Sequence, residues 1–181
     1  MIILQGLYFM LPAYIANMAP VFAEKFGVLK FLARPVDGGR TWRGQPIFGA
    51  HKTWRGFLVG VAAAIVIVWL QYFLYLFPIF QKISLLNYLK INPWLLGFLM
   101  GFGALFGDLV KSFFKRRIKI APGAPWIPFD QLDFVLGALI FAAPICFPSW
   151  SAVIVILLAS PVLHLATNNI GYLLRVKSTR W

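Results

Sequence analysis

Long runs of apolar residues are the feature that most limits how this chain can fold. Apolar residues make up 61% of its 181 residues, and the mean hydropathy is +0.81. A run of about 20 apolar residues is long enough for one helix to cross the hydrocarbon core of a bilayer. The sequence therefore predicts an all-α integral membrane protein of the cell membrane, built as a single domain over residues 1–181.

The apolar runs divide into five predicted transmembrane helices, at about 2–23, 56–78, 93–114, 131–148 and 150–174. No basic stretch precedes the first run, so we expect it to be a retained span and not a cleaved signal peptide. The single cysteine, Cys146, lies in an apolar run. A disulfide framework and a thiolate metal site are therefore both excluded.

Lysine and arginine alternate between the segments that connect these runs. There are none before the first run, seven in residues 24–55, two in 79–92, five in 111–130 and three after 174. Loops rich in Lys and Arg remain on the cytoplasmic side of the membrane. The pattern predicts two basic cytoplasmic loops, a cytoplasmic C-terminus and an N-terminus outside, with all five acidic residues near the cytoplasmic side.

The net charge of +12 indicates an anionic partner. In a soluble protein this excess would suggest nucleic acid, but here the basic residues lie between membrane spans. Anionic lipid headgroups or phosphorylated ligands are then the expected partners, and nucleic acid is not.

Charged residues follow one face of the third predicted helix and its extension. The positions in helical register are Asp108, Lys111, Ser112, Lys115 and Lys119, with Arg116 one step to the side. The lysines alone are equally compatible with an anchor among lipid headgroups. That alternative does not explain Asp108, because an ionisable group at such depth is costly unless it faces a polar cavity, a cation or another charge.

Asp130 and Asp133 stand three residues apart where the fourth predicted helix begins. One interpretation is structural, because acidic residues often cap the start of a helix. The other is a metal site, since three of the few carboxylates in this chain, these two and Asp108, converge around one basic loop. Mg²⁺ is usually bound by a few carboxylates, with water and phosphate as further ligands. We therefore expect Asp108, Asp130 and Asp133 to bind Mg²⁺.

The first cytoplasmic loop combines glycines with cations in "RPVDGGRTWRGQPIFGAHKTWRG". Its spacing does not fit a P-loop, and a solvated basic loop is the alternative to a phosphate-binding one. The candidate ligand-binding residues here are Arg43, His51, Lys52, Thr53 and Arg55. Asn17, a lone amide in the first span, either makes an interhelical hydrogen bond or lines the pocket. The glycine pairs Gly97/Gly101 and Gly103/Gly107 predict close helix packing.

The segments "GDLVKSFFKRR", "PGAPW", "FDQLD" and "AHKTWRG" together resemble the CDP-diacylglycerol synthases, also called phosphatidate cytidylyltransferases. Lys111 stands where that family usually has an acid, and "PGAPW" replaces a His-Gly-Gly turn. With "LPAYIANMAP" and "PVDGGRTWRG", these departures resemble the archaeal CDP-archaeol synthases, which act on ether lipids.

The resemblance implies Mg²⁺-dependent transfer of a cytidylyl group from CTP to the phosphate of an isoprenoid ether lipid. It implies that the three aspartates bind the metal, and that Asp108 and Asp133 also belong to the catalytic set with Lys111, Ser112, Lys115 and Arg116. The ligand-binding set it implies is Asn17, Arg43, His51, Lys52, Thr53, Arg55 and Lys119. A CTP-dependent prenol or dolichol kinase and a small transporter are the alternatives, and the oligomeric state is left open.

Overall fold

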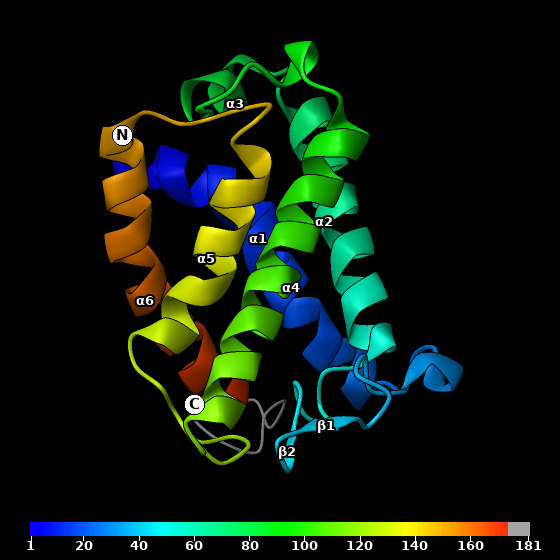
Figure 1. Ribbon diagram of the computed structural model, residues 1–181. Coiled ribbons are helices and arrows are strands. Elements are labelled where there is room, and N and C mark those ends of the chain that lie inside the picture. The colour runs from blue at the N-terminus through cyan, green and yellow to red at the C-terminus, as the bar shows by residue number, and fades with distance from the viewer. Residues whose placement is uncertain (174–181) are drawn as a thin grey trace.

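The computed structural model describes residues 1–173 and consists almost entirely of helices (Figure 1). The helices are α1 (Ile2–Lys25), α2 (Trp54–Leu74), α3 (Pro78–Lys82), α4 (Pro93–Arg117), α5 (Phe129–Ala142) and α6 (Trp150–Leu173), with 3₁₀ turns η1 (Lys30–Leu32) and η2 (Tyr88–Lys90). The basic residues predicted for a cytoplasmic C-terminal tail, after residue 174, lie outside the described residues.

Four of the helices, α1, α2, α4 and α6, are long and apolar enough to cross a membrane. This arrangement confirms a multi-pass membrane protein. The predicted span 131–148 is different, because α5 has only 14 residues and so measures about 21 Å, less than the ~30 Å of a hydrocarbon core. Pro144 lies just past its end and cannot continue the helical hydrogen bonds. The connector that follows takes the chain to the end of the molecule where α6 begins (Figure 1).

The two glycine pairs pack α4 against neighbours on two sides, which confirms the predicted close packing. A Cβ atom at Gly97 would lie 2.6 Å from the Ile65 Cα of α2, and one at Gly101 would lie 2.7 Å from the Ala64 Cβ. On the other side, a Cβ at Gly107 would lie 2.9 Å from the Asp133 carbonyl carbon of α5. Only glycine allows these approaches, and the second one places the carboxylates of α4 and α5 close together.

Helix α1 contacts four other helices, α2, α4, α5 and α6. Pro12 has no N–H, so the Tyr8 carbonyl lacks its helical donor. Gln71 of α2 donates to that carbonyl at 2.5 Å, and Tyr14 and Ser160 of α6 share a buried hydrogen bond of 2.7 Å. These polar contacts fix α1 against α2 and α6.

The first basic loop also forms a small antiparallel hairpin, β1 (Thr41–Trp42) and β2 (Gln45–Pro46), which the all-α prediction did not include. Arg43 and Gly44 both have positive φ at its turn, the conformation that a two-residue hairpin requires. The hairpin and the α4–α5 loop lie at the same end of the molecule, and α3 lies at the opposite end (Figure 1). The two basic loops therefore meet in space.

Candidate functional site

A cavity of about 620 Å³ lies at the end of the molecule where the two basic loops meet. Residues of α1, the first loop, α4, the α4–α5 loop, α5 and α6 line it. Four of the five acidic residues of the chain line this cavity, together with five lysines and arginines: Glu24, Asp108, Asp130 and Asp133, and Lys52, Arg55, Lys111, Lys115 and Arg116. Its size is that of pockets that enclose small organic ligands, about 300–1,000 Å³.

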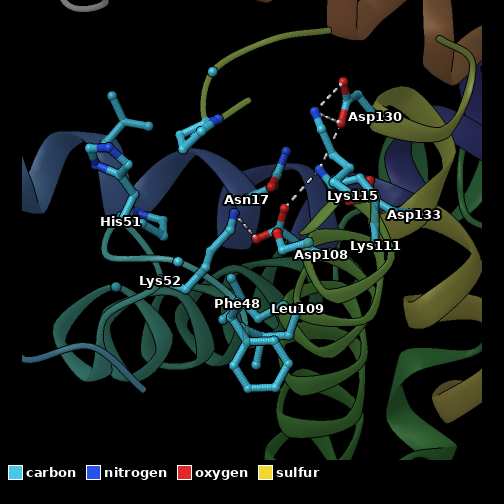
Figure 2. A pocket seen from close by; sticks show the side chains of 18 of the residues that line it. Asn17, Phe48, His51, Lys52, Asp108, Leu109, Lys111, Lys115, Asp130 and Asp133 are labelled. Carbon is cyan, nitrogen blue, oxygen red and sulfur yellow. Dashed lines mark hydrogen bonds and ion pairs between the residues drawn. The ribbon is translucent and has the colours of Figure 1, made fainter. Parts of the chain in front are cut away.

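The ammonium group of Lys111 lies between three carboxylates (Figure 2). Its Nζ is 2.9 Å from Asp108 Oδ1, 2.8 Å from Asp133 Oδ2 and 3.1 Å from Asp130 Oδ1. Asp108 is one helical turn before Lys111 on α4, whereas the other two aspartates are on α5. The close packing of these two helices therefore creates a concentrated patch of negative charge around one cation.

Lys52 brings the first loop to the same cluster. Its Nζ donates to Asp108 Oδ2, so this carboxylate accepts hydrogen bonds from both Lys52 and Lys111 (Figure 2). The neighbouring Thr53 caps α2 by accepting from the Gly56 amide at 3.2 Å, which fixes where the helix starts. The first loop and α4 therefore each supply one lysine that donates to the Asp108 carboxylate.

Asp130 and Lys115 hold the second basic loop against the cavity. Lys115 Nζ donates to the Ala124 carbonyl at 2.5 Å and to both oxygens of Asp130 at 3.1 Å. Asp130 also accepts from the Trp126 amide at 2.5 Å. Helix α5 has Pro128 at its N-cap and no side-chain capping bond, so neither aspartate has the capping role that was the alternative interpretation.

Several buried polar atoms around the cavity have no hydrogen-bond partner among residues 1–173. They include Asp133 Oδ1, Arg55 Nε, Arg116 Nε and Gln131 Oε1. Buried polar atoms are nearly always paired in folded proteins, so unpaired ones that line a cavity indicate a missing polar ligand. This cavity offers both donors and acceptors to such a ligand.

The donor chemistry of the three aspartates suits a hard divalent cation, which prefers oxygen ligands. In the described part of the chain, no three carboxylate, thiol or imidazole groups form a metal site by themselves. The positive charge of Lys111 lies between the acids instead. It forms an ion pair with Asp133 Oδ2, whereas Asp133 Oδ1 has no hydrogen-bond partner among residues 1–173. Both Asp108 and Asp130 already accept from lysines, so a cation would take the place of a lysine ammonium group. One at the position of the Lys111 ammonium group would be bound by Asp108 and Asp133, whereas Asp130 would keep its hydrogen bonds from Lys115 and the Trp126 amide.

Asp37 shapes the backbone of the first loop where it faces the cavity. Its carboxylate accepts from the amides of Gly39 and Phe48 at 2.9 Å and of Gly49 at 3.2 Å. Partial burial alone would raise the pKa of Asp37, but these backbone donors outweigh it and hold the pKa below its usual value. The segment that leads to Lys52 is therefore held by hydrogen bonds from its backbone to one half-buried carboxylate.

Most of the residues singled out from the sequence come together in this cavity. The lining includes Asn17, His51, Lys52, Thr53, Arg55, Asp108, Lys111, Ser112, Lys115, Arg116, Asp130 and Asp133. Arg43 and Lys119 are not among the lining residues. Arg43 is exposed in the hairpin turn, and Lys119 is exposed beyond α4.

The predicted stripe of cations on α4 stops at Lys115 because the helix ends earlier than expected. The last helical residue is Arg117, and Lys119 has a φ of 60°. The Ile120 amide donates to the Lys115 carbonyl at 2.9 Å and the Lys119 amide to the Arg116 carbonyl at 3.3 Å, which is a Schellman ending. The left-handed residue turns the chain, so Lys119 leaves the face that carries Asp108 and Lys111.

Sequence reasoning did not assign four polar residues of the cavity to the site: Glu24, Gln131, His164 and Asn168. Gln131 was hidden between the two aspartates of "FDQLD" and is buried. His164 and Asn168 are four residues apart, which places them on one face of α6, and their side chains lie 3.3 Å apart. That spacing of polar residues in an apolar helix is the signal that would have identified them.

Arg117 joins the hairpin of the first loop to the end of α4. Its Nη1 donates to the Trp42 carbonyl at 2.6 Å, and its Nη2 donates to the carbonyls of Pro46 at 2.5 Å and Gln45 at 3.3 Å. The guanidinium also lies over the rings of Trp42 and Phe113. A planar group with several fixed donors is suited to this contact, and lysine is not.

We expect Arg117→Ala to release the hairpin. Hydrogen bonds to a charged donor contribute about 1.5–3 kcal/mol, so amide hydrogen exchange across residues 37–51 should become at least about tenfold faster. Arg117→Lys should restore only part of the protection. Arg40→Ala, an exposed arginine in the same loop, is the matched control and should exchange as the wild type does. Unchanged exchange in Arg117→Ala would show that the hairpin is held by other contacts.

Several known proteins are similar to this chain in sequence, and one is similar in fold. The whole chain, residues 1–181, matches the family model described as CarS-like, CDP-archaeol synthase. A CDP-archaeol synthase of Thermococcus onnurineus is 43% identical, covering 99% of this chain and 97% of the relative. One from Methanococcoides burtonii is 42% identical, covering 95% of this chain and all of the relative.

A solved structure is also similar to this fold. It is described as an intramembrane enzyme for archaeal membrane lipid biosynthesis, and it matches with a TM-score of 0.73 and 33% identity over 92% of this chain and 94% of its own. Full-length matches in sequence and in fold therefore agree with the resemblance carried by the motifs around Lys52, Asp108 and Asp133. On these grounds, the chain belongs to the CDP-archaeol synthase family.

Proposed function

We propose that this protein is a CTP-dependent lipid cytidylyltransferase. It transfers the cytidylyl group of CTP to the phosphate of an unsaturated isoprenoid ether lipid, 2,3-di-O-geranylgeranyl-sn-glycerol 1-phosphate, and yields the CDP-lipid and pyrophosphate. The observation that carries the proposal is the convergence of Asp108, Asp130 and Asp133 on Lys111 inside a cavity lined by further cations. Membership of the CDP-archaeol synthase family supports it.

The reaction is an in-line displacement at the α-phosphorus of CTP. An oxygen of the lipid phosphate forms a bond to this phosphorus while the bond to the β-phosphate oxygen breaks. A phosphate monoester is already anionic at neutral pH, so no strong protein base is needed. Catalysis then depends on holding two anionic reactants together and on neutralising their charge.

The cations of the cavity supply this neutralisation. Arg55 and Arg116 pair with no carboxylate among residues 1–173, and the buried Nε of each has no hydrogen-bond partner there, so their donors are available to phosphate oxygens. Lys52 shares Asp108 with Lys111 and can redirect its ammonium group to a phosphate. Lys115 is buried between Asp130 and the second loop, and it both orders that loop and contributes positive charge. Ser112 is buried on the same face of α4 and offers a hydroxyl donor. His51 and Asn17 lie at other walls of the cavity (Figure 2).

Mg²⁺ is the cofactor that this donor set suits best. Asp108 and Asp133 would hold it, with Asp130 as a third carboxylate close by. When bound, the metal would neutralise charge on the triphosphate and on the departing pyrophosphate. Lys111 would then share the carboxylates with the metal, and in the absence of the metal its charge offsets the repulsion between the two aspartates.

The isotope position in the products tests the proposed reaction. Label from α-³²P-CTP should appear in the lipid, and label from γ-³²P-CTP should appear in pyrophosphate. A CTP-dependent prenol or dolichol kinase would give γ-label in the lipid and would accept an unphosphorylated alcohol. Thin-layer separation of lipid products distinguishes the two results, and a diether alcohol that is used as well as its phosphate would overturn the transferase proposal. Transport without CTP hydrolysis in liposomes would instead favour a transporter.

The membrane topology is proposed with five crossings, the N-terminus outside and the cavity on the cytoplasmic side. The chain passes between the two ends of the molecule along α1, α2, α4, α5 with its connector, and α6 (Figure 1). The end with the cavity carries the two loops rich in Lys and Arg, whereas the other end carries Lys82 and Lys90. This distribution supports the orientation by the positive-inside rule.

Cysteine labelling in intact cells checks the sidedness. With buried Cys146 replaced by alanine, a cysteine at residue 40 or 118 should react only after the membrane is permeabilised. A cysteine at residue 85 should react with an impermeant maleimide from outside. Labelling of residue 118 in intact cells would place the cavity on the outer side, where CTP is not supplied.

A further inference from the structure

A second, smaller cavity of about 190 Å³ lies between α1 and α6. Its lining is largely apolar and consists of Tyr14, Asn17, Met18, Val21, Phe22, Phe134, Leu163, His164, Thr167, Asn168, Ile170 and Gly171. We call it the α1–α6 groove. Three of its polar residues, Asn17, His164 and Asn168, also line the charged cavity, so the two spaces adjoin.

The groove has a closed inner end and a rim that faces the bilayer. The buried hydrogen bond between Tyr14 and Ser160 lies at its inner end, and Phe134 packs edge-on against Tyr14 with ring centroids 5.8 Å apart. At the rim, the side chains of Phe22 and Ile170 are 40% and 54% exposed. Both belong to helices that are long and apolar enough to cross a membrane, so a rim of exposed apolar side chains is suited to contact with lipid.

We propose that the α1–α6 groove binds the part of one isoprenoid chain that adjoins the glycerol unit of the lipid substrate. The inference rests on the proposed function and adds the place where the lipid enters. An amphiphile with an apolar chain on an anionic head needs an apolar surface next to a cationic one, and only a continuous site offers both to the same molecule. The groove is smaller than the roughly 300–1,000 Å³ that encloses a whole ligand, so the rest of the chain remains among the bilayer lipids.

Polar side chains at the junction between the groove and the charged cavity indicate how a bound lipid is oriented. Asn168 is buried and lies 3.3 Å from His164 Nδ1, and Asn17 faces them from α1. Beyond this junction lie the cations around Asp108 and Lys111 (Figure 2). A phosphate that passes the junction therefore reaches the charged cavity while its chain stays in the groove. Asn17, His164 and Asn168 then lie beside the glycerol phosphate of the bound lipid, between its apolar chain and the cations that face CTP.

Filling the groove tests the proposal. Met18→Trp and Leu163→Trp change residues that line only the groove, one from each helix. Each should raise the KM for the long-chain lipid phosphate at least about tenfold, leave the Kd for CTP within about twofold, and keep transfer to a short-chain glycerol phosphate analogue. Val162→Trp is the matched control, because this α6 side chain is 69% exposed to the bilayer. A wild-type KM in both filled variants would overturn the proposal.

Photocrosslinking decides the matter without turnover and without a substituted residue. A glycerol ether phosphate with a diazirine on the chain next to the glycerol unit should label the wild type in residues 14–22 and 163–171, and unlabelled lipid phosphate should compete. Labelling confined to other helices would overturn the groove proposal. The proposed function fails on a different result, namely α-labelled CTP that leaves no label in lipid, so the two failures are separable.

Discussion

Asp133→Asn is expected to lower the rate of cytidylyl transfer by at least about 100-fold while the protein stays folded in detergent. Loss of groups that only support metal ligands costs about 10–100-fold, and loss of a ligand charge should cost no less. The amide keeps the shape of the side chain, but it removes the charge that would hold Mg²⁺ next to Lys111. Asp108→Asn should behave in the same way, because Asp108 shares that cation and Lys52.

The melting temperature and Mg²⁺ binding should be measured on the same variants. Asp133 makes no capping bond at the start of α5, and Lys111 keeps Asp108 and Asp130 as partners after the substitution. The loss of stability should therefore be smaller than in Lys111→Met, and the variant should stay folded. The Mg²⁺ concentration that gives half-maximal activity should rise in whatever activity remains. A variant that lost thermal stability but turned over normally when folded would assign Asp133 to structure and not to the metal.

Lys111→Met is expected to destabilise the protein by about 3–5 kcal/mol, because it leaves partly buried charges without their shared partner. The Lys111 side chain is only 14% exposed, and three carboxylates lie within 3.1 Å of its nitrogen. Without that cation, the aspartates of α4 and α5 repel each other across the closest helix contact in the fold. Thermal unfolding in detergent measures the loss.

Added Mg²⁺ should restore more stability to Lys111→Met than to the wild type, since the metal can replace the missing positive charge. Lys90→Met removes an exposed lysine at the opposite end of the molecule and should change stability by no more than about 0.5 kcal/mol. If Lys111→Met melted at the wild-type temperature, or if Mg²⁺ had the same effect on both proteins, the three carboxylates would not form one electrostatic cluster.

Much of the candidate site could be predicted from the sequence, because charged residues are few in this apolar chain and are easy to identify. With only five acidic residues in the chain, the pairing of Asp108 with Asp130 and Asp133 could be anticipated, and so could a contribution from Lys52 in the other loop. Gln131 could not, because a single buried amide gives no signal until it is known which helix face lines a cavity. The roles assigned to all these residues remain predictions until the substitutions are tested.

The limits of pattern reasoning are clearest where a local backbone change moved a side chain. Helical periodicity placed Lys119 on the face of Asp108, but a left-handed residue at the end of α4 removed it from that face. Apolar content predicted one continuous helical span at 131–148. In the structure, α5 covers only Phe129–Ala142 because Pro144 cannot continue the helical hydrogen bonds, and an irregular connector leads from α5 to α6.

The sequence by itself determined that this chain is a helical membrane protein with most of its charged residues at one end. The signals were the lengths of the apolar runs, the alternation of basic loops and the glycine pairs of α4. These features depend on transfer to the bilayer and on local spacing, which the sequence states directly. Only the tertiary structure decided that Lys111 lies among three carboxylates, that Arg117 holds the hairpin, and that α1 and α6 leave a groove beside the cavity. Those features arise where segments far apart in the chain approach within a few ångströms, and a one-dimensional pattern does not encode that approach.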